Sequence, residues 1–219
     1  MGARGDPTTG RLTSVNVGAP RAIEVDGRTV VTAIWKSPVE GRVALRGVNL
    51  HGDDQADRSV HGGPDKAVYA YASEDTAWWD AQLGAALGAG AFGENLTTAG
   101  LPVSEAVIGE RWEVGSALLE VAQPRLPCFK LGVRMGDPRF LKRFAVAGRP
   151  GAYLRVVREG DIGAGDRIDV VSRPAHGVTS ALVSRSLLRE PELLTVALQA
   201  PELPAGLRAW MRERAGDDA

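Results

Sequence analysis

Short runs that alternate apolar and polar residues dominate most of the chain. Residues 12–17 alternate in this way, and residues 23–25 and 28–35 flank the pair Asp26-Gly27. An Asp-Gly pair between two such runs is typical of a two-residue β-hairpin, because both turn positions need a positive φ. Further strands are predicted at residues 43–50, 67–71, 111–114, 117–122, 152–157 and 167–171. Many short strands with glycine-bearing turns favour a closed or nearly closed β-barrel over a parallel α/β sheet.

Two short helices are predicted to interrupt these strands. The first begins at Ser73, which can cap it, and ends at Gly88. The second begins at Asp137-Pro138 and continues through Phe144, with proline at the first helical position.

The pattern changes after Pro174, where helical segments replace strands. Residues 179–189, 191–199 and 204–214 are each predicted to form a short helix. The expected organisation is therefore a flexible tail at residues 1–10, a mainly β barrel domain at 11–173 and a small three-helix C-terminal unit at 174–219.

Composition and charge narrow the class of protein. Apolar residues make up 44% and charged residues 24% of the 219 residues, which is enough apolar content for a packed core. The net charge of −1 argues against bulk electrostatic binding to nucleic acid or to an anionic membrane. No apolar run approaches the roughly 20 residues of a spanning helix, and residues 1–10 lack the apolar stretch of a secretory signal. A single cysteine rules out an internal disulfide and fits the reducing cytoplasm, where we expect the protein to act.

That cysteine, Cys128, is the first candidate for chemistry. It follows a predicted strand in a turn held by Pro124 and Pro127, and Arg125 and Lys130 supply positive charge nearby. Cations favour the thiolate if their side chains turn toward the sulfur. A thiolate there can be a nucleophile, a sulfur carrier or a soft metal ligand, whereas a buried, inert cysteine is the alternative.

A glycine-rich loop is the second candidate. It contains Asp57, His61, Gly62, Gly63 and Lys66. Its glycines let backbone N–H groups converge on an anion, and the histidine and lysine add donors and charge. The loop has neither the spacing of a phosphate-binding Walker loop nor that of a helical zinc site, so a surface turn is the alternative.

Two further polar positions lie beside turns. Glu94 and Asn95 follow Gly93, and Lys36 leaves the second strand of the predicted hairpin. Glu94 is a candidate general acid or base, although an isolated glutamate more often bridges backbone groups. Lys36 alone is typical of a solvated surface residue.

Taken together, these loops resemble one family. Six motifs occur in the order found in MOSC proteins, named after the C-terminal domain of molybdenum cofactor sulfurases: Lys36-x-Pro38-Val39, the Gly52–Asp57 segment, His61-Gly62-Gly63-Pro64-Asp65-Lys66, Gly93-Glu94-Asn95-Leu96, Gln123-Pro124-Arg125-x-Pro127-Cys128 and Gly151-Ala152-Tyr153-x-Arg155-Val156. Each motif is weak alone, whereas six in the same order are specific. The chain is most similar to the small bacterial members associated with resistance to 6-hydroxylaminopurine, which also end in a three-helix unit. The resemblance spans roughly residues 12–215.

The resemblance implies a β-barrel whose rim loops hold a molybdenum cofactor, with molybdenum on the dithiolene of a phosphorylated pterin. The family's proposed metal ligand corresponds to Cys128. Cys128 and His61 are the expected catalytic residues. The residues that the resemblance places around the cofactor are Lys36, Asp57, His61, Gly62, Gly63, Lys66, Glu94, Asn95, Arg125 and Arg155. Lys36, Arg125, Arg155 or the loop of residues 61–66 would neutralise the pterin phosphate.

Two functions follow from this resemblance. The first is an oxidoreductase that reduces N-hydroxylated bases or related compounds at the molybdenum centre. Electrons would come from an external donor protein, because no flavin, nicotinamide or iron–sulfur fingerprint is present. The second is a carrier that holds a persulfide or the cofactor on Cys128 and passes it on. Pyridoxal phosphate is not expected, since it belongs to a separate part of the larger sulfurases. The helical tail is expected to dock on its own barrel, on a second copy in a homodimer or on a redox partner.

Overall fold

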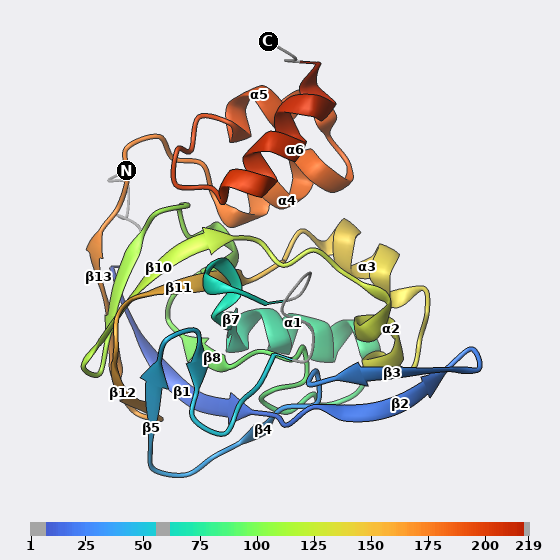
Figure 1. The fold of residues 1–219 in the computed structure, drawn as a ribbon, viewed down its shortest axis with the longest axis vertical. Coiled ribbons are helices and arrows are strands. Elements are labelled where there is room, and N and C mark those ends of the chain that lie inside the picture. Colours follow the sequence, from blue (N-terminus) through green and yellow to red (C-terminus); the bar gives the residue numbers. More distant parts are fainter. Residues whose placement is uncertain (1–7, 56–61, 217–219) are drawn as a thin grey trace.

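A closed β-barrel forms the body of the protein in this computed structural model, which describes residues 8–55 and 62–216 (Figure 1). The predicted Asp57 and His61 lie outside the described residues. The barrel strands are β1 (Thr9–Val17), β7 (Val68–Ala72), β8 (Leu96–Ala99), β9 (Arg111–Val114), β10 (Ala117–Gln123), β11 (Ala152–Arg158) and β13 (Arg167–Ser172). They follow the order β13-β9-β10-β11-β7-β8-β1, and pairing of β1 with β13 closes the ring. All these pairs are antiparallel except β7 with β8. The predicted mainly β barrel is confirmed.

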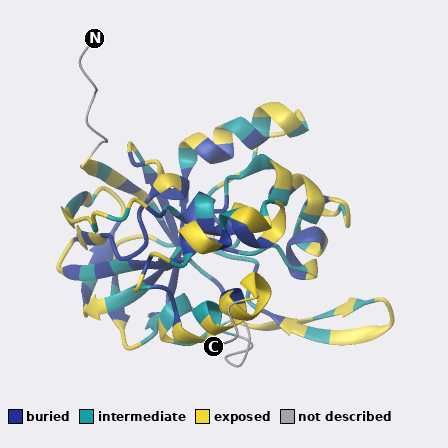
Figure 2. Ribbon diagram, turned by 90° about the horizontal axis from the view of Figure 1, so that it is seen from above, coloured by how far each residue is buried: buried dark blue, intermediate teal, exposed yellow. Residues whose placement is uncertain are grey.

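A hairpin of β2 (Arg21–Val25) and β3 (Arg28–Thr32) projects from this barrel and is largely exposed (Figure 2). Its turn residues Asp26 and Gly27 have φ of 49° and 72°, as the Asp-Gly signal predicted. The prediction of one strand over residues 43–50 was wrong. A turn at Gly47, with φ of 57°, divides it into β5 (Arg42–Arg46) and β6 (Asn49–Leu50).

The remaining short strands extend these sheets. β4 (Ser37–Pro38) pairs with the end of β1, and β12 (Gly160–Gly163) pairs with β5.

Three helices lie beside the barrel: α1 (Ser73–Leu83), α2 (Phe129–Met135) and α3 (Phe140–Ala147). α1 follows β7 directly, so the N-cap position falls on Ala72 and Ser73 does not cap the helix. The helix ends at Gly84, whose φ of 64° gives a left-handed cap, and not at Gly88 as predicted.

The segment between β10 and α3 also differs from the prediction. α3 begins later than expected, because the carboxylate of Asp137 accepts a hydrogen bond of 2.9 Å from the amide of Arg139 and holds residues 137–139 as a turn. The sequence did not predict α2, which begins at the residue after Cys128.

The C-terminal helices cover one end of the barrel (Figure 1). Thr179 caps α4 (Ser180–Leu188) by accepting a hydrogen bond of 3.2 Å from the amide of Leu182. The second predicted helix is a 3-10 turn, η3 (Pro191–Leu193), followed by α5 (Leu194–Ala197), and the third is α6 (Ala205–Ala215). Leu194 and Met211 belong to the same core cluster as the barrel residues Leu119 and Leu154, so the helical unit shares the barrel's hydrophobic core.

A second, aromatic core lies on the outer face of β7, under α1 and α3. It contains Tyr71, Trp79, Phe92 and Phe144, and the rings of Tyr71 and Phe92 are 4.5 Å apart between centroids. Burying such rings stabilises the fold by roughly 1.5–3 kcal/mol for each side chain. This core therefore fixes the loop around Phe92 next to the ends of β7 and β11.

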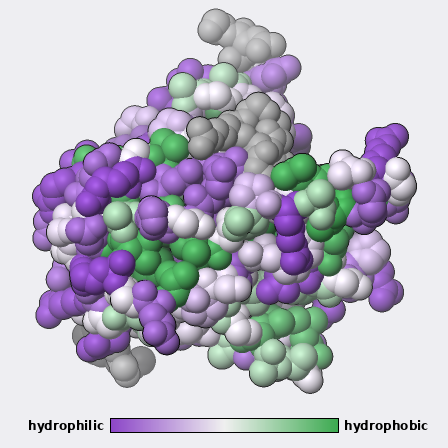
Figure 3. Space-filling view, turned by 60° about the horizontal axis from the view of Figure 1, so that its bottom comes forward, coloured by the Kyte–Doolittle hydropathy of each residue, from purple (hydrophilic) through white to green (hydrophobic). Residues whose placement is uncertain are grey.

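The surface seen from below is mainly hydrophilic, with apolar side chains in separate patches (Figure 3). Two 3-10 turns complete the described elements, η1 (Pro64–Lys66) and η2 (Val103–Glu105). Within the described ranges, no helix combines the length and the apolar content needed to cross a membrane.

Candidate active site

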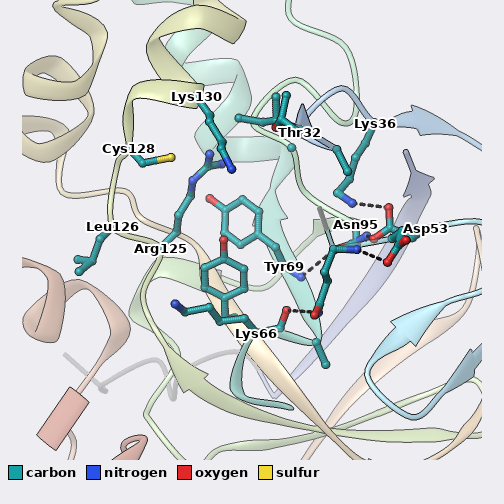
Figure 4. A pocket seen from close by; sticks show the side chains of 17 residues that line it. Thr32, Lys36, Asp53, Lys66, Tyr69, Asn95, Arg125, Leu126, Cys128 and Lys130 are labelled. Atoms are coloured by element: carbon teal, nitrogen blue, oxygen red, sulfur yellow. Dashed lines mark hydrogen bonds and ion pairs between the residues drawn. The ribbon is translucent and has the colours of Figure 1, made fainter. Parts of the chain in front are cut away.

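Several predicted polar residues converge on one pocket of about 110 Å³ outside the barrel wall (Figure 4). The pocket lies between the base of the β2–β3 hairpin and the segment that leads into α2. The residues that line it are Thr32, Ala33, Ile34, Lys36, Asp53, Asp54, Gln55, Lys66, Ala67, Tyr69, Gly93, Asn95, Arg125, Leu126, Cys128, Lys130 and Tyr153.

Cys128 occupies one side of this pocket. Its backbone is extended, with φ of −127° and ψ of 166°, and its side chain is partly buried. The sulfur points toward the guanidinium of Arg125, with the ammonium of Lys130 on the same side (Figure 4). We call these three residues the Cys128 side.

Arg125 is buried and held by neutral groups. Its Nη1 donates to the carbonyl oxygen of Phe92, and its guanidinium carbon lies 5.1 Å from the ring centroid of Tyr69. Burial opposes its charge, but Tyr69, Tyr153 and Cys128 together outweigh burial and raise the pKa of Arg125. The permanently charged guanidinium thus acts directly on the sulfur of Cys128.

Lys130 is the second cation beside Cys128. Only 8% of the residue is exposed, and it lines the pocket. Within residues 8–55 and 62–216, neither Lys130 nor Arg125 pairs with a carboxylate. Buried cations are normally paired, because removing charge from water is costly. The Cys128 side is therefore built to receive negative charge.

Lys36 and Asp53 form the opposite side of the pocket, which we call the Asp53 side together with Asn95. Lys36 and Asp53 form an ion pair whose side chains are 8% and 4% exposed. The second carboxylate oxygen of Asp53 accepts a hydrogen bond of 2.8 Å from the side-chain amide of Asn95. Burial lowers the pKa of Lys36, and its ion pair with Asp53 opposes that shift.

Asn95 connects this network to the barrel. Its side-chain oxygen accepts a hydrogen bond of 3.1 Å from the backbone amide of Tyr69 on β7. Its side-chain nitrogen donates a hydrogen bond of 3.2 Å to the carbonyl of Asn16 on β1. These bonds hold the Asp53 side against two strands.

Glu94 holds the loop before β8 and does not line the pocket. Its carboxylate accepts from the amides of Gly90 at 2.6 Å and Phe92 at 2.9 Å, and from the hydroxyl of Thr97 at 3.1 Å. Complete burial raises the pKa of Glu94, although these hydrogen bonds oppose the shift. These contacts match the alternative in which Glu94 bridges backbone groups, rather than a general acid or base in the pocket.

Gly93 lets this loop approach the hairpin closely. Its φ is 73°, and a Cβ there would lie 2.8 Å from Cγ1 of Ile34. A glycine is needed because both the backbone conformation and the space exclude a side chain.

The glycine-rich loop reaches the pocket through its end. The amide of Gly63 donates 2.9 Å to the side-chain oxygen of Gln55, whose nitrogen donates 3.1 Å to the carbonyl of Lys66. Lys66 lines the pocket, whereas Gly62 and Gly63 do not.

The structure separates the predicted site residues into two groups. Lys36, Lys66, Asn95, Arg125 and Cys128 line one pocket. Arg155 does not, although Tyr153 on the same strand does. Residues two apart on a strand share a face but lie about 7 Å apart, so Arg155 is carried past the pocket, where it bonds Asp65, Glu120 and Glu202.

Sequence reasoning missed several pocket residues. The sequence indicates Lys130 only as a charge close to Cys128 along the chain, and α2 places it on the same side of the pocket as Cys128. Tyr69 and Tyr153, whose ring centroids are 5.1 Å apart, form the wall beneath Arg125. Each tyrosine follows an apolar residue in a predicted strand, so no local signal distinguished the two from core residues.

The pocket residues fit a molybdenum–pterin group in their chemistry. Thiolate is a soft ligand suited to such a metal, and two buried cations beside Cys128 suit an anionic group. The cavity, about 110 Å³, is smaller than the roughly 300–1,000 Å³ of usual small-molecule pockets. A cavity of this size encloses only part of a group as large as this cofactor.

Known proteins are similar to this chain in sequence and in fold. A family model described as "MOSC domain" matches residues 57–169. A Bacillus subtilis (strain 168) protein named "Uncharacterized protein YflK" is 37% identical over 182 residues, which cover 83% of this chain and 82% of that protein. A Gibberella moniliformis protein named "Reductase" is 33% identical over 202 residues, which cover 90% of this chain but only 36% of that protein.

The crystal structure of YiiM from Geobacillus stearothermophilus superimposes with a TM-score of 0.77 at 32% identity, covering 94% of this chain and 99% of that one. The family model spans half of the chain, and the Bacillus relative matches over most of both sequences. The chain belongs to the MOSC domain family.

Proposed function

We propose that the pocket binds a molybdenum cofactor with Cys128 as the protein ligand to the metal, and that the protein reduces N-hydroxylated bases or related compounds. The observation that carries this proposal is the Cys128 side. It presents a thiol that points toward Arg125 and Lys130, two buried cations without carboxylate partners in the described part of the chain. Membership of the MOSC family and a relative named "Reductase" support the same class of chemistry.

Each residue would have a definite part in this site. Arg125 holds its charge at every physiological pH and favours the thiolate of Cys128, the form that binds a metal. Lys130 and Lys66 bring further positive charge to the pocket for the anionic groups of the cofactor. Lys36, held by Asp53, keeps the opposite wall in place.

When bound, the cofactor supplies a two-electron redox centre. Reduction of an N-hydroxyl group breaks the N–O bond, consumes two electrons and two protons, and releases the amine and water. We propose that an external donor protein supplies the electrons.

A reduction assay tests this function. Protein isolated from a host that makes the cofactor is supplied with reduced methyl viologen and 6-hydroxylaminopurine, and amine formation is followed chromatographically. We expect turnover by the wild type and none by Cys128→Ser of equal thermal stability. Full activity in the Cys128→Ser protein would remove the metal-ligand role.

A sulfur or cofactor carrier is the second candidate, because the partly buried Cys128 sulfur faces an open pocket that admits a small group. Mass spectrometry of freshly isolated protein separates the two. A stable extra sulfur on Cys128 without metal supports the carrier, whereas molybdenum with pterin supports the reductase.

A further inference from the structure

Arg155 lies on β11, two residues beyond the pocket-lining Tyr153, and its side chain is 21% exposed. It faces away from the barrel core, because its neighbour Leu154 is completely buried. Its guanidinium contacts three segments that are far apart in the sequence. Nε donates a hydrogen bond of 2.5 Å to the carboxylate of Asp65, and Nη1 donates one of 2.9 Å to the carboxylate of Glu120. Nη2 donates 2.8 Å to the carbonyl of Glu202.

The register of the barrel fixes one of these contacts. Glu120 on β10 lies directly opposite Arg155 on β11 and directly opposite Arg111 on β9. Arg111 also donates to Glu120, at 2.9 Å. Arg111, Glu120 and Arg155 thus form a row across three strands, which holds the guanidinium of Arg155 in place. Its remaining N–H groups can then bond Asp65 and the carbonyl of Glu202.

Asp65 connects Arg155 to the pocket. It lies in η1, directly before the pocket-lining Lys66. The carbonyl of Asp65 also accepts 3.3 Å from the side chain of Gln123 on β10. The end of the glycine-rich loop is thus anchored on its carboxylate by Arg155 and on its backbone by the strand that leads to Cys128.

Glu202 connects Arg155 to the C-terminal helices. It lies between α5 and α6, and its own carboxylate meets Nε2 of His176 at 3.2 Å. Its side chain packs on Gly109, where a Cβ would lie 2.7 Å from Cγ of Glu202. Residue 202 is therefore fixed against the barrel by its side chain while its carbonyl accepts from Arg155.

We propose that Arg155 is a positioning residue that couples the C-terminal helical unit to the site loop through Asp65, and not a ligand of the bound group. Lysine cannot replace it, because one ammonium cannot meet three acceptors in the fork geometry of a guanidinium. The proposal rests on the proposed function only in naming the pocket as the site. The coupling itself is a property of the protein without cofactor.

Amide hydrogen exchange of the cofactor-free full chain tests the coupling. In Arg155→Gln, peptides that cover residues 62–67 and 198–204 are expected to exchange about tenfold faster, because each loses a charge-assisted hydrogen bond. Arg111→Gln is the matched control, since it also removes a bond to Glu120 but touches neither of the other segments. In Asp65→Asn, which removes the carboxylate but keeps Arg155, residues 62–67 are expected to exchange faster. Residues 198–204 should also exchange faster, by a smaller factor, because Arg155 loses one of the contacts that orient it.

Unchanged exchange at residues 62–67 or at residues 198–204 in a folded Arg155→Gln protein overturns the coupling. If that variant does not fold, Arg155→Lys is used, for which we expect faster exchange in at least one of the two segments and not in the rest of the barrel. Uniformly faster exchange throughout the barrel also overturns the proposal, since it indicates a general loss of stability.

Cofactor content gives a second readout. Arg155→Gln is expected to retain less molybdenum and pterin than Arg111→Gln, although Arg155 does not line the pocket. If the wild type holds no cofactor, the proposed function fails, and the exchange result still decides the role of Arg155.

Discussion

The two sides of the pocket use buried cations in opposite ways. On the Asp53 side, Lys36 is paired with Asp53, and Asn95 ties that pair to β1 and β7. On the Cys128 side, Arg125 is bonded to the carbonyl of Phe92, and Lys130 has no carboxylate partner among the described residues. On the Asp53 side, the charge of Lys36 is balanced within the protein, and the pair is held in a fixed position against the barrel. The Cys128 side leaves positive charge for a ligand.

The difference separates stability from binding. Removing one partner of a balanced buried pair leaves the other charge without compensation, so the fold loses stability. Removing an unbalanced buried cation relieves a desolvation cost, so the fold is not harmed while anion binding weakens. Substitutions on the two sides should therefore differ in whether they weaken the fold or the binding of the cofactor.

Cys128→Ser is expected to have the largest effect. Hard serine oxygen replaces the soft thiolate, and loss of a direct ligand should lower molybdenum retention by more than the roughly 10–100-fold typical of outer-shell changes. Molybdenum per chain after gel filtration measures it. A thermal midpoint equal to that of the wild type shows that the fold is intact, and wild-type metal content in the variant would contradict the prediction.

Lys36→Met is expected to destabilise the fold by about 3–5 kcal/mol, because it leaves Asp53 charged and buried. Urea unfolding measures the change. The double variant Lys36→Met/Asp53→Asn is the control, and it should recover part of the loss because the uncompensated charge is gone. A loss below about 1 kcal/mol in the single variant, as for a surface pair, would show that the Asp53 side is not a balanced structural unit.

Lys130→Met is expected to show the reverse pattern. The methionine keeps an unbranched side chain that is shorter by one atom and carries no charge, so the unfolding free energy should stay near that of the wild type or rise. Cofactor retention should fall about tenfold or more, since one charged hydrogen-bond donor to the anion is lost. Equal losses of stability in Lys130→Met and Lys36→Met would erase the distinction between the two sides.

Glu94 gives the smallest effect, which appears as a pH dependence. Its folded-state pKa is raised above the ordinary 4.5 by burial, so the fold favours the neutral carboxyl. That contribution is fully present below pH 4.5 and is lost as the pH rises through the raised pKa. The unfolding free energy of the wild type minus that of Glu94→Gln should therefore fall with rising pH in this window. A difference that rises instead would contradict the assignment.

Six of the seven barrel strands were predictable because their pattern is local, whereas the sequence did not predict β8, whose four residues are short and do not alternate between buried and exposed positions. The strand predicted at residues 111–114 matches β9, and the Asp26-Gly27 turn was recognised from two residues that need a positive φ. The ends of α1 and α3 were not predictable in the same way. Ser73 lost the capping position because β7 ends at Ala72 and runs directly into the helix.

The site was predictable in its loops but not in its charge balance. The motif order indicated Lys36, Lys66, Asn95, Arg125 and Cys128, which the fold brings together. The pairing of Lys36 with Asp53, the position of Lys130 on α2 and the displacement of Arg155 from the pocket depend on tertiary contacts between distant segments. No local pattern contains that information.

We infer that the Cys128 side holds a molybdenum–pterin group. Quantitative metal and pterin analysis of the wild type, isolated from a host that makes the cofactor, decides whether it does. We predict close to one molybdenum and one pterin per chain, both lost together in Cys128→Ser. Folded wild-type protein that carries neither would contradict the claim.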